Sequence, residues 1–174
     1  NNLRVSRRAC FTGCALMVFF VTGLVCLVRF EKLIIYNPTP SVEEGFYVYA
    51  GQEYGRGQII LFSTPQAVKD YTAANYAAAP LEHFLKPVLA AEGDHVCYRQ
   101  GRFFLNGAFL ADVQKYDSAG KLLPVWKGCR VLGAGEYFVF SDRVRNSFDS
   151  RYYGPVPEKD IVGVFAPLFK RGEK

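Results

Sequence analysis

The stretch that decides the fold runs from His83 to Leu110 and reads HFLKPVLAAEGDHVCYRQGRFFLNGAFL. Apolar runs alternate in it with turn signals, and the clearest turn is Asn106-Gly107, which lies between two such runs. An Asn-Gly pair in that setting is a strong signal for a two-residue β-hairpin. Further strand-like runs occur over residues 45–49, 58–62, 136–140 and 161–165. Short strands separated by turns predict a mainly antiparallel β domain.

One segment interrupts the β pattern between residues 64 and 80. Thr64 before Pro65 is typical of a helix start, with threonine as N-cap and proline as the first helical residue. Residues 66–79 are rich in alanine, which favours helix, and Pro80 ends the run. We expect a small helical insertion here, and it is a candidate lid or substrate contact.

The N-terminal region predicts a membrane anchor. Residues 10–28 carry no charge, and a helix of that length is about 28 Å long, close to the thickness of a hydrocarbon core. A cleaved signal peptide or a buried core helix are the alternatives, but the run ends in Arg29-Phe30-Glu31-Lys32 without a small-residue cleavage site. Arg4, Arg7 and Arg8 precede the run, so the positive-inside rule places the N-terminus in the cytoplasm.

These signals divide the chain into three parts. Residues 1–9 form a cytoplasmic N-terminus, residues 10–28 a single transmembrane span in the lipid bilayer, and residues 29–174 a domain outside it, in a bacterial cell the periplasm. The net charge of +5 is concentrated at one end, since residues 1–29 carry +4 and the other 145 residues carry +1. The domain therefore lacks the basic footprint of a nucleic-acid binder.

Two cysteines fall in the exported part, Cys97 and Cys129. A pair of cysteines in an oxidising compartment is a candidate disulfide, and two unrelated buried thiols are the alternative. Their spacing argues against a zinc site built from clustered cysteines and histidines. No metal motif such as His-Glu-x-x-His and no glycine-rich phosphate loop occurs, so we expect no metal and no cofactor.

The titratable residues limit the possible nucleophilic chemistry. Only His83 and His95 could serve a Ser-His-Asp triad, and no Gly-x-Ser-x-Gly signature is present. A serine–lysine pair remains, in which burial must lower the lysine pKa from about 10.4 toward 7–8. Lys86 lies among apolar residues with no charged neighbour, although a lone strand lysine usually faces solvent. Pro87 cannot donate a ladder hydrogen bond, so Lys86 should lie at a strand edge or a bulge.

Three segments, in order, resemble the conserved boxes of the bacterial type I signal peptidases. They are NPTPSVEEG over residues 37–45, LKPVLAAEGD over 85–94, and SDRVRNSFDSRYYG over 141–154. The third is the most specific, through its Ser-x-Asp-Ser-Arg-Tyr-x-Gly pattern. The resemblance covers residues 10–168 and implies a signal-peptidase-like β domain. The first box, with Gly-Phe-Tyr after it, is similar to the conjugative-transfer peptidases of the TraF type. The Cys97 and Cys129 pair also looks like that branch.

The resemblance implies a role for each matching residue. Ser41 is the nucleophile and Lys86 its general base. The oxyanion site consists of the Ser41 N–H and the Thr39 hydroxyl. Ser147 orients the lysine. The supporting charges are Asp142, Asp149 and Arg151.

The TraF-type branch implies a substrate, a membrane-tethered precursor of a conjugative pilin, which some members also join into a ring. Three alternatives remain. One is a general signal peptidase for secretory preproteins, and another is a catalytically inert scaffold of a mating or secretion apparatus. Self-cleaving repressors of the LexA type share the chemistry, but the predicted anchor argues against a cytosolic DNA binder. Hydrolysis and ring closure of the acyl-enzyme both remain open.

Overall fold

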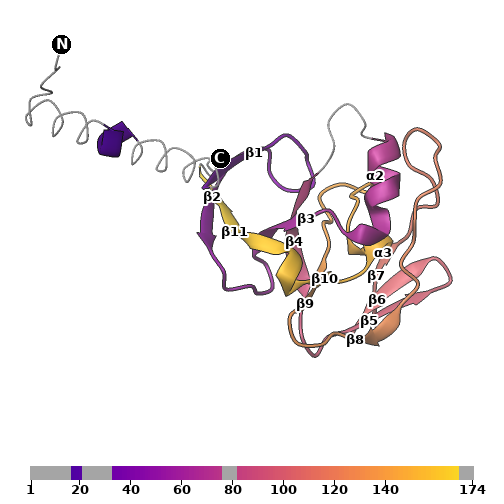
Figure 1. Cartoon of the computed structure of the whole chain (residues 1–174). Helices are drawn as coiled ribbons and strands as arrows, with labels where there is room; N and C mark the ends of the chain where they lie inside the picture. The colour runs from indigo at the N-terminus through magenta and orange to yellow at the C-terminus, as the bar shows by residue number, and fades with distance from the viewer. Residues whose placement is uncertain (1–16, 21–32, 76–81, 169–174) are drawn as a thin grey trace, which may run out of the picture. The chain divides into compact units, whose positions relative to one another are not determined.

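The computed structural model describes residues 17–20, 33–75 and 82–168 (Figure 1). The chain divides into two compact units, residues 1–35 and residues 36–174. In the first unit Met17 to Phe20 are helical. The rest of the anchor predicted over residues 10–28 lies outside the described residues. Within the described residues, no helix has the length and apolar character needed to cross a bilayer.

The second unit is built mainly from antiparallel β-strands, as predicted. One sheet has seven strands in the order β1-β2-β11-β3-β4-β9-β10, and the other has four in the order β7-β6-β5-β8. The strands of the larger sheet are β1 (Ile34–Asn37), β2 (Gly45–Gly51), β3 (Ile59–Ser63), β4 (His83–Ala90), β9 (Glu136–Val139), β10 (Val156–Pro157) and β11 (Ile161–Pro167). Those of the smaller sheet are β5 (His95–Arg99), β6 (Arg102–Leu105), β7 (Ala108–Asp112) and β8 (Cys129–Val131).

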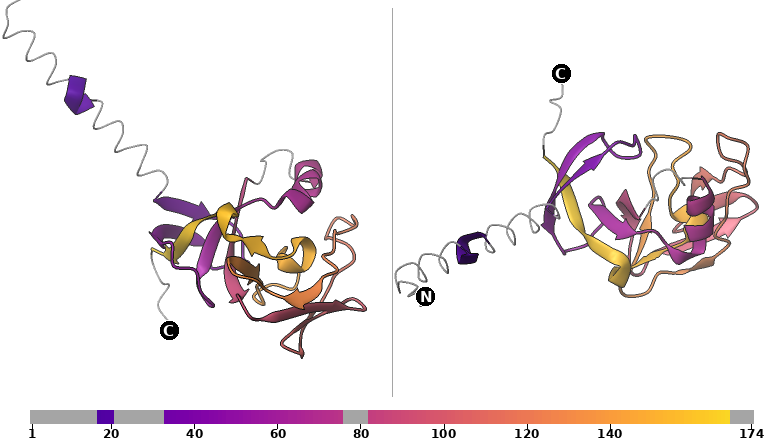
Figure 2. Two further views of the ribbon diagram at one scale, coloured as in Figure 1. Left: turned by 60° about the horizontal axis from the view of Figure 1, so that its bottom comes forward. Right: turned by 45° about the horizontal axis from the view of Figure 1, so that its top comes forward.

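The stretch from His83 to Leu110 forms β4, β5, β6 and the first part of β7. The Asn-Gly turn is confirmed between β6 and β7, where Asn106 and Gly107 have φ angles of 51° and 84°. Two positive φ values suit a turn that follows the twist of its strands, and asparagine and glycine accept them most readily. In Figures 1 and 2 the strands β5 to β8 lie at the end of the domain away from β2 and β11.

Several short elements, among them β1, β8, β10 and the helix α3 (Ser150–Tyr153), were not predicted from the sequence. All three residues of β8 are exposed, so the strand has no alternation of buried and exposed residues to mark it. β10 has only two residues. Such elements exist because the sheet supplies their partners, which local periodicity does not show.

The helical insertion is present, but it begins later than predicted. A 3₁₀ turn, η1 (Gln66–Val68), leads into the helix α2 (Lys69–Asn75), and residues 76–81 lie outside the described residues. Pro65, and not Thr64, occupies the N-cap position, and no side chain caps the turn. The prediction of Thr64 as N-cap is therefore wrong. Thr64 instead continues the pairing of β3, since its N–H donates to the carbonyl of Glu82.

Two groups of buried residues form the core. The first lies under the large sheet and contains Ile60, Phe62, Val68, Phe84, Val88, Val139, Tyr152, Tyr153, Val156 and Val164. The second lies where the small sheet joins it and contains Ala90, Val96, Phe103, Leu132 and Phe138. β4 contributes to both groups, so this strand fixes the position of each sheet's core.

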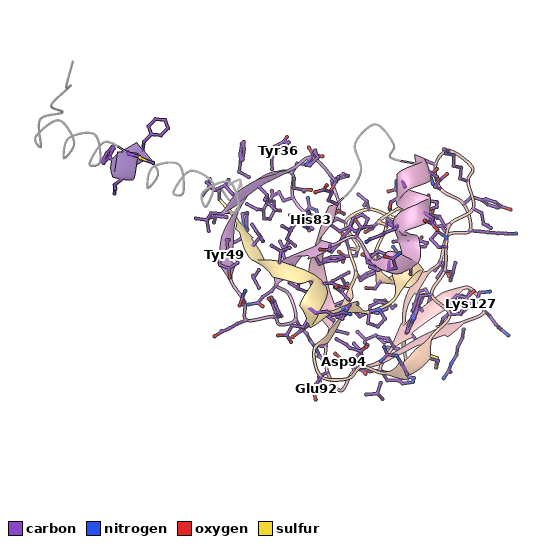
Figure 3. The ribbon with its side chains drawn as sticks, viewed as in Figure 1. Tyr36, Tyr49, His83, Glu92, Asp94 and Lys127 are labelled. Atoms are coloured by element: carbon purple, nitrogen blue, oxygen red, sulfur yellow. A yellow bond between two sulfur atoms is a disulfide. The ribbon has the colours of Figure 1, made fainter. Side chains whose placement is uncertain are left out.

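The turn between β4 and β5 is held by a buried carboxylate (Figure 3). Asp94 is 3% exposed and accepts hydrogen bonds from Ala91 N at 2.9 Å, from Asn106 Nδ2 at 2.8 Å and from Arg56. Burial alone would raise the pKa of Asp94, but the bonds from Asn106, Ala91 and Arg56 outweigh it and lower the pKa. The ionised carboxylate thus joins the turn to the tip of the β6–β7 hairpin.

β4 is paired on both sides, but only over part of its length. It pairs with β3 over residues 83–87 and with β9 from Val88 onward, with an irregularity between Val88 and Ala90. Within the described residues, the flank of residues 83–86 opposite β3 has no strand partner. Pro87 sits where this free flank ends, and its carbonyl accepts from Phe140 N at 3.2 Å. The expectation that Lys86 lies at a local edge next to a bulge is confirmed.

Cys97 and Cys129 face each other across the β5–β8 pair, and their sulfurs lie at disulfide-bonding distance. The bond closes a loop with a sequence separation of 32 residues. A crosslink of that span stabilises a fold chiefly by restricting the unfolded chain.

We expect the double substitution Cys97→Ser and Cys129→Ser to lower the free energy of unfolding by about 3 kcal/mol. Urea unfolding of the full chain in detergent, with and without a dithiol reductant, measures the loss. The reductant should destabilise the unsubstituted chain to a similar extent and leave the variant unchanged. Equal stability of the two chains under oxidising conditions would contradict a structural disulfide.

Candidate active site

The loop that carries Ser41 is shaped by the side chain of Asn37, the last residue of β1. Its Nδ2 donates to the carbonyls of Thr39 at 2.7 Å and Glu43 at 3.1 Å, and its Oδ1 accepts from Thr39 N at 3.2 Å. The prolines at 38 and 40 disfavour helix, and the chain turns at Pro40 and Ser41. Asn37 thus hydrogen-bonds to residues on both sides of Ser41. In this loop Ser41 is only 4% exposed.

The two residues expected to bind the oxyanion lie close together. Thr39 Oγ1 and Ser41 Oγ are 3.3 Å apart. Thr39 Oγ1 is also 2.8 Å from Asn37 Oδ1, an atom that can only accept, so the threonine hydroxyl is the donor there. Since a hydroxyl has one proton, Thr39 can donate to an oxyanion only if substrate displaces this bond.

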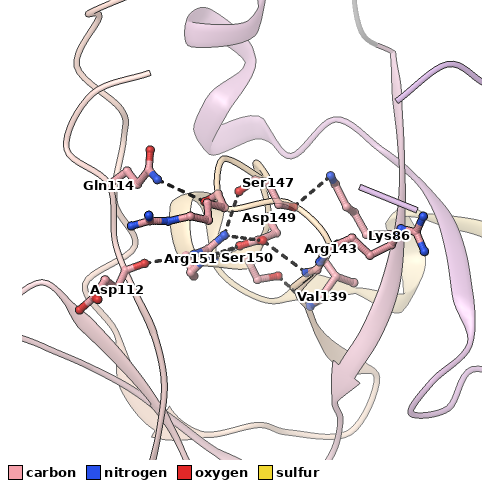
Figure 4. Close-up of polar contacts among 11 residues, drawn as sticks. Lys86, Asp112, Gln114, Val139, Arg143, Ser147, Asp149, Ser150 and Arg151 are labelled. Atoms are coloured by element: carbon pink, nitrogen blue, oxygen red, sulfur yellow. Dashed lines mark hydrogen bonds and ion pairs between the residues drawn. The ribbon is translucent and has the colours of Figure 1, made fainter. Parts of the chain in front are cut away.

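Lys86 lies in the interior on β4, with 6% of its surface exposed. Its Nζ lies 3.3 Å from Ser147 Oγ, as Figure 4 shows. Burial lowers the pKa of Lys86 from 10.5 to about 8, while Asp149 raises it and Arg151 lowers it. An amine with a pKa near 8 is partly neutral at physiological pH and can accept a proton.

Behind Lys86 lies a fully buried ion pair between Asp149 and Arg151. Arg151 Nε donates to Asp149 Oδ1 at 2.8 Å and its Nη2 donates to Oδ2 at 2.9 Å. Arg151 Nη2 also donates to the carbonyl of Ser147 at 3.0 Å, and Nη1 to that of Asp112 at 3.1 Å. A bidentate, well-satisfied pair tolerates burial, whereas either charge alone would not. The pair therefore fixes the backbone on which Ser147 is presented.

The short helix α3 completes this corner. Asp149 is its N-cap and accepts from Arg151 N at 3.3 Å. Gly154 is its C-cap, with φ of 85°, and a Cβ there would lie 2.7 Å from the ring of Trp126. Both features explain why α3 has aspartate before its first residue and glycine after its last.

The nucleophile loop is joined to this corner through Ser141. Ser141 Oγ donates to the carbonyl of Ser41, and Ser141 N lies 3.5 Å from Asp149 Oδ2. Arg143 Nε donates to the carbonyl of Pro40 at 3.4 Å. Sequence reasoning assigned no role to Ser141 or Asn37, although both stand inside the quoted boxes. Asn37 is the first residue of the first box and Ser141 the first residue of the third, and this was the one sequence signal that pointed to them.

The structure brings together most of the predicted residues, but not all. Lys86, Ser147, Asp149 and Arg151 form one cluster, and Thr39 and Ser41 another, joined by Ser141. The structure records no hydrogen bond between Ser41 Oγ and Lys86 Nζ. Asp142 has an exposed side chain and makes no hydrogen bond or ion pair with any described residue. Its supporting role stays a prediction.

One cluster was not expected from sequence spacing. His95, Cys97 and Cys129 place three potential ligand atoms within 4.8 Å of one another, with His95 Nε2 3.8 Å from Cys129 Sγ. The sequence spacing did not predict this proximity, because strand pairing brings the residues side by side. The expectation that there is no zinc site stays a prediction. With the two sulfurs at bonding distance, the cluster offers no thiolate, and His95 is the one ligand available.

Comparison with known proteins defines the class of this chain as a serine peptidase. It belongs to the family described as signal peptidase, peptidase S26, whose sequence profile matches residues 7–169. It is 30% identical over 142 residues to the plasmid transfer protein TraF of Escherichia coli, covering 76% of this chain and 80% of that protein. It is 32% identical over 157 residues to a probable signal peptidase I-2 of Synechocystis, covering 82% and 66%.

A solved structure also matches. The signal peptidase I of Enterococcus faecalis is 23% identical, with a TM-score of 0.39 over 66% of this chain and 98% of that chain. The proposed Ser-Lys chemistry of the present chain rests on its own geometry, described above.

We expect Lys86→Met to be inactive yet more stable than the unsubstituted chain at pH 7. Below pH 8 Lys86 is charged in both folded and unfolded states, so the folded protein bears the whole cost of the lowered pKa, about 3 kcal/mol. Between pH 8 and 10.5 the folded state loses this proton first, so the advantage of the variant should shrink as pH rises. Urea unfolding at pH 7 and pH 10 measures both values.

Lys127→Met is the matched control, because Lys127 is exposed (Figure 3). It should change stability little at either pH. A Lys86→Met variant that is less stable than the unsubstituted chain at pH 7 would show that the buried amine is favourable in its charged form.

Proposed function

We propose that this chain is a membrane-anchored serine endopeptidase that cleaves an exported, membrane-tethered precursor with a Ser41–Lys86 dyad. The observation that carries the proposal is the buried amine of Lys86, which has a pKa of about 8 and contacts Ser147. An isolated lysine in such a site costs stability, so its presence is best explained by chemistry. This argues against the inert-scaffold alternative, for which an apolar residue at 86 would serve better.

The proposed reaction uses these groups in turn. Ser41 Oγ attacks the scissile carbonyl, and its proton passes to the neutral Lys86 Nζ. The oxyanion forms opposite the Ser41 N–H and Thr39 Oγ1, and each such donor is worth about 3–4 kcal/mol. The lysine then protonates the leaving amine and leaves an acyl-enzyme on Ser41. Attack by water gives a linear product, whereas attack by an amine of the precursor itself would give a ring.

The substrate is proposed from the relatives and from the anchor. Similarity to TraF over three quarters of the chain favours a plasmid-transfer role and hence a conjugative pilin precursor. Ser41 follows the predicted span by 13 residues, which keeps it within about 45 Å of the membrane even if the linker is extended. Enzyme and precursor held in one membrane meet at raised effective concentration. The proposal therefore includes a single-pass inner-membrane protein whose domain lies in the periplasm.

A general signal peptidase is the second candidate, because the similarity to the Synechocystis signal peptidase extends over 82% of the chain. The two can be separated in a bacterium depleted of its own signal peptidase. Growth restored by this chain would support broad processing of secretory preproteins. Failure to grow, with cleavage of the pilin precursor, would support the conjugative role.

We expect cleavage by the full chain in membranes to depend on a neutral Lys86. The ratio kcat/KM should rise about tenfold per pH unit below pH 8 and level off above it, because the amine must lose its proton to act as base. Ser41→Ala should lower kcat by about 10³-fold or more. Ser118→Ala, in an exposed turn, is the matched control and should retain full activity. An active Ser41→Ala variant would refute the assigned nucleophile.

The fate of the acyl-enzyme can be read from product mass. Mass spectrometry of the pilin recovered from cells with and without this protein should show a shortened product only when the protein is present. A mass lower by one water than that of the linear product indicates ring closure, and the linear mass indicates hydrolysis. A full-length precursor in both samples would rule out the pilin as substrate.

A further inference from the structure

Among the described residues of the helical insertion, Tyr71 of α2 brings an aromatic ring to the active-site corner. Its ring stacks on that of Phe148, with centroids 5.3 Å apart and planes inclined by 23°. Phe148 stands in the chain between Ser147 and Asp149, the residue that contacts Lys86 and the residue that caps α3. In Figures 1 and 2 the helix α2 lies beside α3.

Phe148 is held from several sides by aromatic rings. It stacks on Tyr152 at 5.2 Å and contacts Tyr153 at 5.7 Å, both on α3. It also contacts Phe84 at 6.0 Å, two residues before Lys86 on β4. Strand residues two apart lie on one face, so Phe84 and Lys86 point the same way. Tyr71 adds a ring from the insertion to the aromatic side chains around Phe148.

Tyr71 is itself fixed at its far end. Its hydroxyl donates to Asp117 Oδ2 at 2.7 Å. The other oxygen of Asp117 accepts from Ala119 N at 2.9 Å and Lys121 N at 2.8 Å. The hydrogen bonds from Tyr71 and then from Lys121 lower the pKa of Asp117, so this carboxylate is ionised at neutral pH. Tyr71 therefore bridges the loop after β7 and the active-site corner.

The contact between Lys86 and Ser147, which the Tyr71 bridge supports, tolerates little movement. Lys86 Nζ and Ser147 Oγ lie 3.3 Å apart, near the long end of hydrogen-bonding distances. The backbone of Ser147 is held by its N–H, which donates to Val144 O at 3.1 Å, and by Arg151 Nη2 on its carbonyl. The bond to the Ser147 carbonyl holds the peptide between Ser147 and Phe148, and the stack with Tyr71 holds the Phe148 ring that follows it. A shift of one ångström at Ser147 would lengthen its contact with Lys86 beyond hydrogen-bonding distance.

We propose that Tyr71 is a positioning residue of the Ser41–Lys86 centre, which holds Ser147 within reach of Lys86 through its stack on Phe148. The inference rests on the proposed function and gives the helical insertion a role in the reaction. Tyr71 need not touch substrate, which distinguishes this role from that of a lid.

The titration of Lys86 reports on this role. The charges that act on it are Asp149, which favours the protonated amine, and Arg151, which disfavours it, and burial is the largest influence. Loss of the Tyr71 ring should loosen the corner and admit water toward the amine. The pKa of Lys86 should then rise from about 8 toward 10.5.

The experiment compares Tyr71→Leu with Tyr71→Phe in the full chain in detergent. The lysine pKa is read without substrate, by NMR titration of lysines labelled with ¹³C at Cε, with the Lys86 signal assigned by its loss in Lys86→Met. We expect Tyr71→Leu to raise this pKa and the acid limb of the pH–rate profile together, and to lower kcat about ten- to hundredfold with little change in KM. Tyr71→Phe keeps the ring and should keep both values.

Phe109→Leu is the control for loss of an aromatic ring elsewhere, because Phe109 is exposed in the small sheet. It should change neither quantity. An unchanged lysine pKa and kcat in Tyr71→Leu would overturn the proposal. So would equal losses in Tyr71→Phe, since the hydroxyl bond and not the stack would then matter.

Folding is checked by the thermal midpoint of each variant. If Tyr71→Leu fails to fold, Tyr71→Met carries the same expectations, and failure of both to fold would also overturn the proposal, because Tyr71 would then support the whole domain. The proposed function fails separately, if Ser41→Ala remains active. The substrate-free titration still decides the role of Tyr71 in that case.

Discussion

The structure depends on one unfavourable interaction, the burial of the Lys86 amine without a carboxylate partner in direct contact. A lysine placed in this way gives up hydration, and the fold bears that loss at neutral pH. The groups around the amine reduce this free-energy cost. Ser147 gives the amine one hydrogen bond, and β4 is paired firmly with β3 over the same residues. The outcome is an amine whose pKa of about 8 lies near working pH.

The ion pair of Asp149 and Arg151 explains how this balance is kept. Their effects on the Lys86 pKa are opposite in sign, so the pair leaves burial as the dominant influence. The same pair caps α3 and holds the carbonyl of Ser147. One buried pair therefore sets both the local field and the local geometry. Ser141 extends this framework to the backbone of Ser41, so the proposed nucleophile and the proposed base are positioned against the same support.

Family membership and geometry support different parts of the functional account. The match over residues 7–169 shows that the chain belongs to the family described as signal peptidase, peptidase S26. The geometry supports the assignment of the base within it, through the burial and contact of Lys86. The role of the insertion comes from the contacts of Tyr71 alone, because its neighbours in the chain give no hint of a link to Ser147.

The sequence by itself determined the antiparallel β class and the Asn106-Gly107 turn, and its resemblance to a family picked out the three boxes. The class and the turn follow from local patterns, such as turn chemistry and short apolar runs, which act over a few residues. Only the tertiary structure decided that Asn37 bends the loop that carries Ser41, that His95 lies beside Cys129, and that β8 exists. These depend on partners distant in the chain, and the free energy that forms them comes from pairing and burial between segments, which a local pattern does not record.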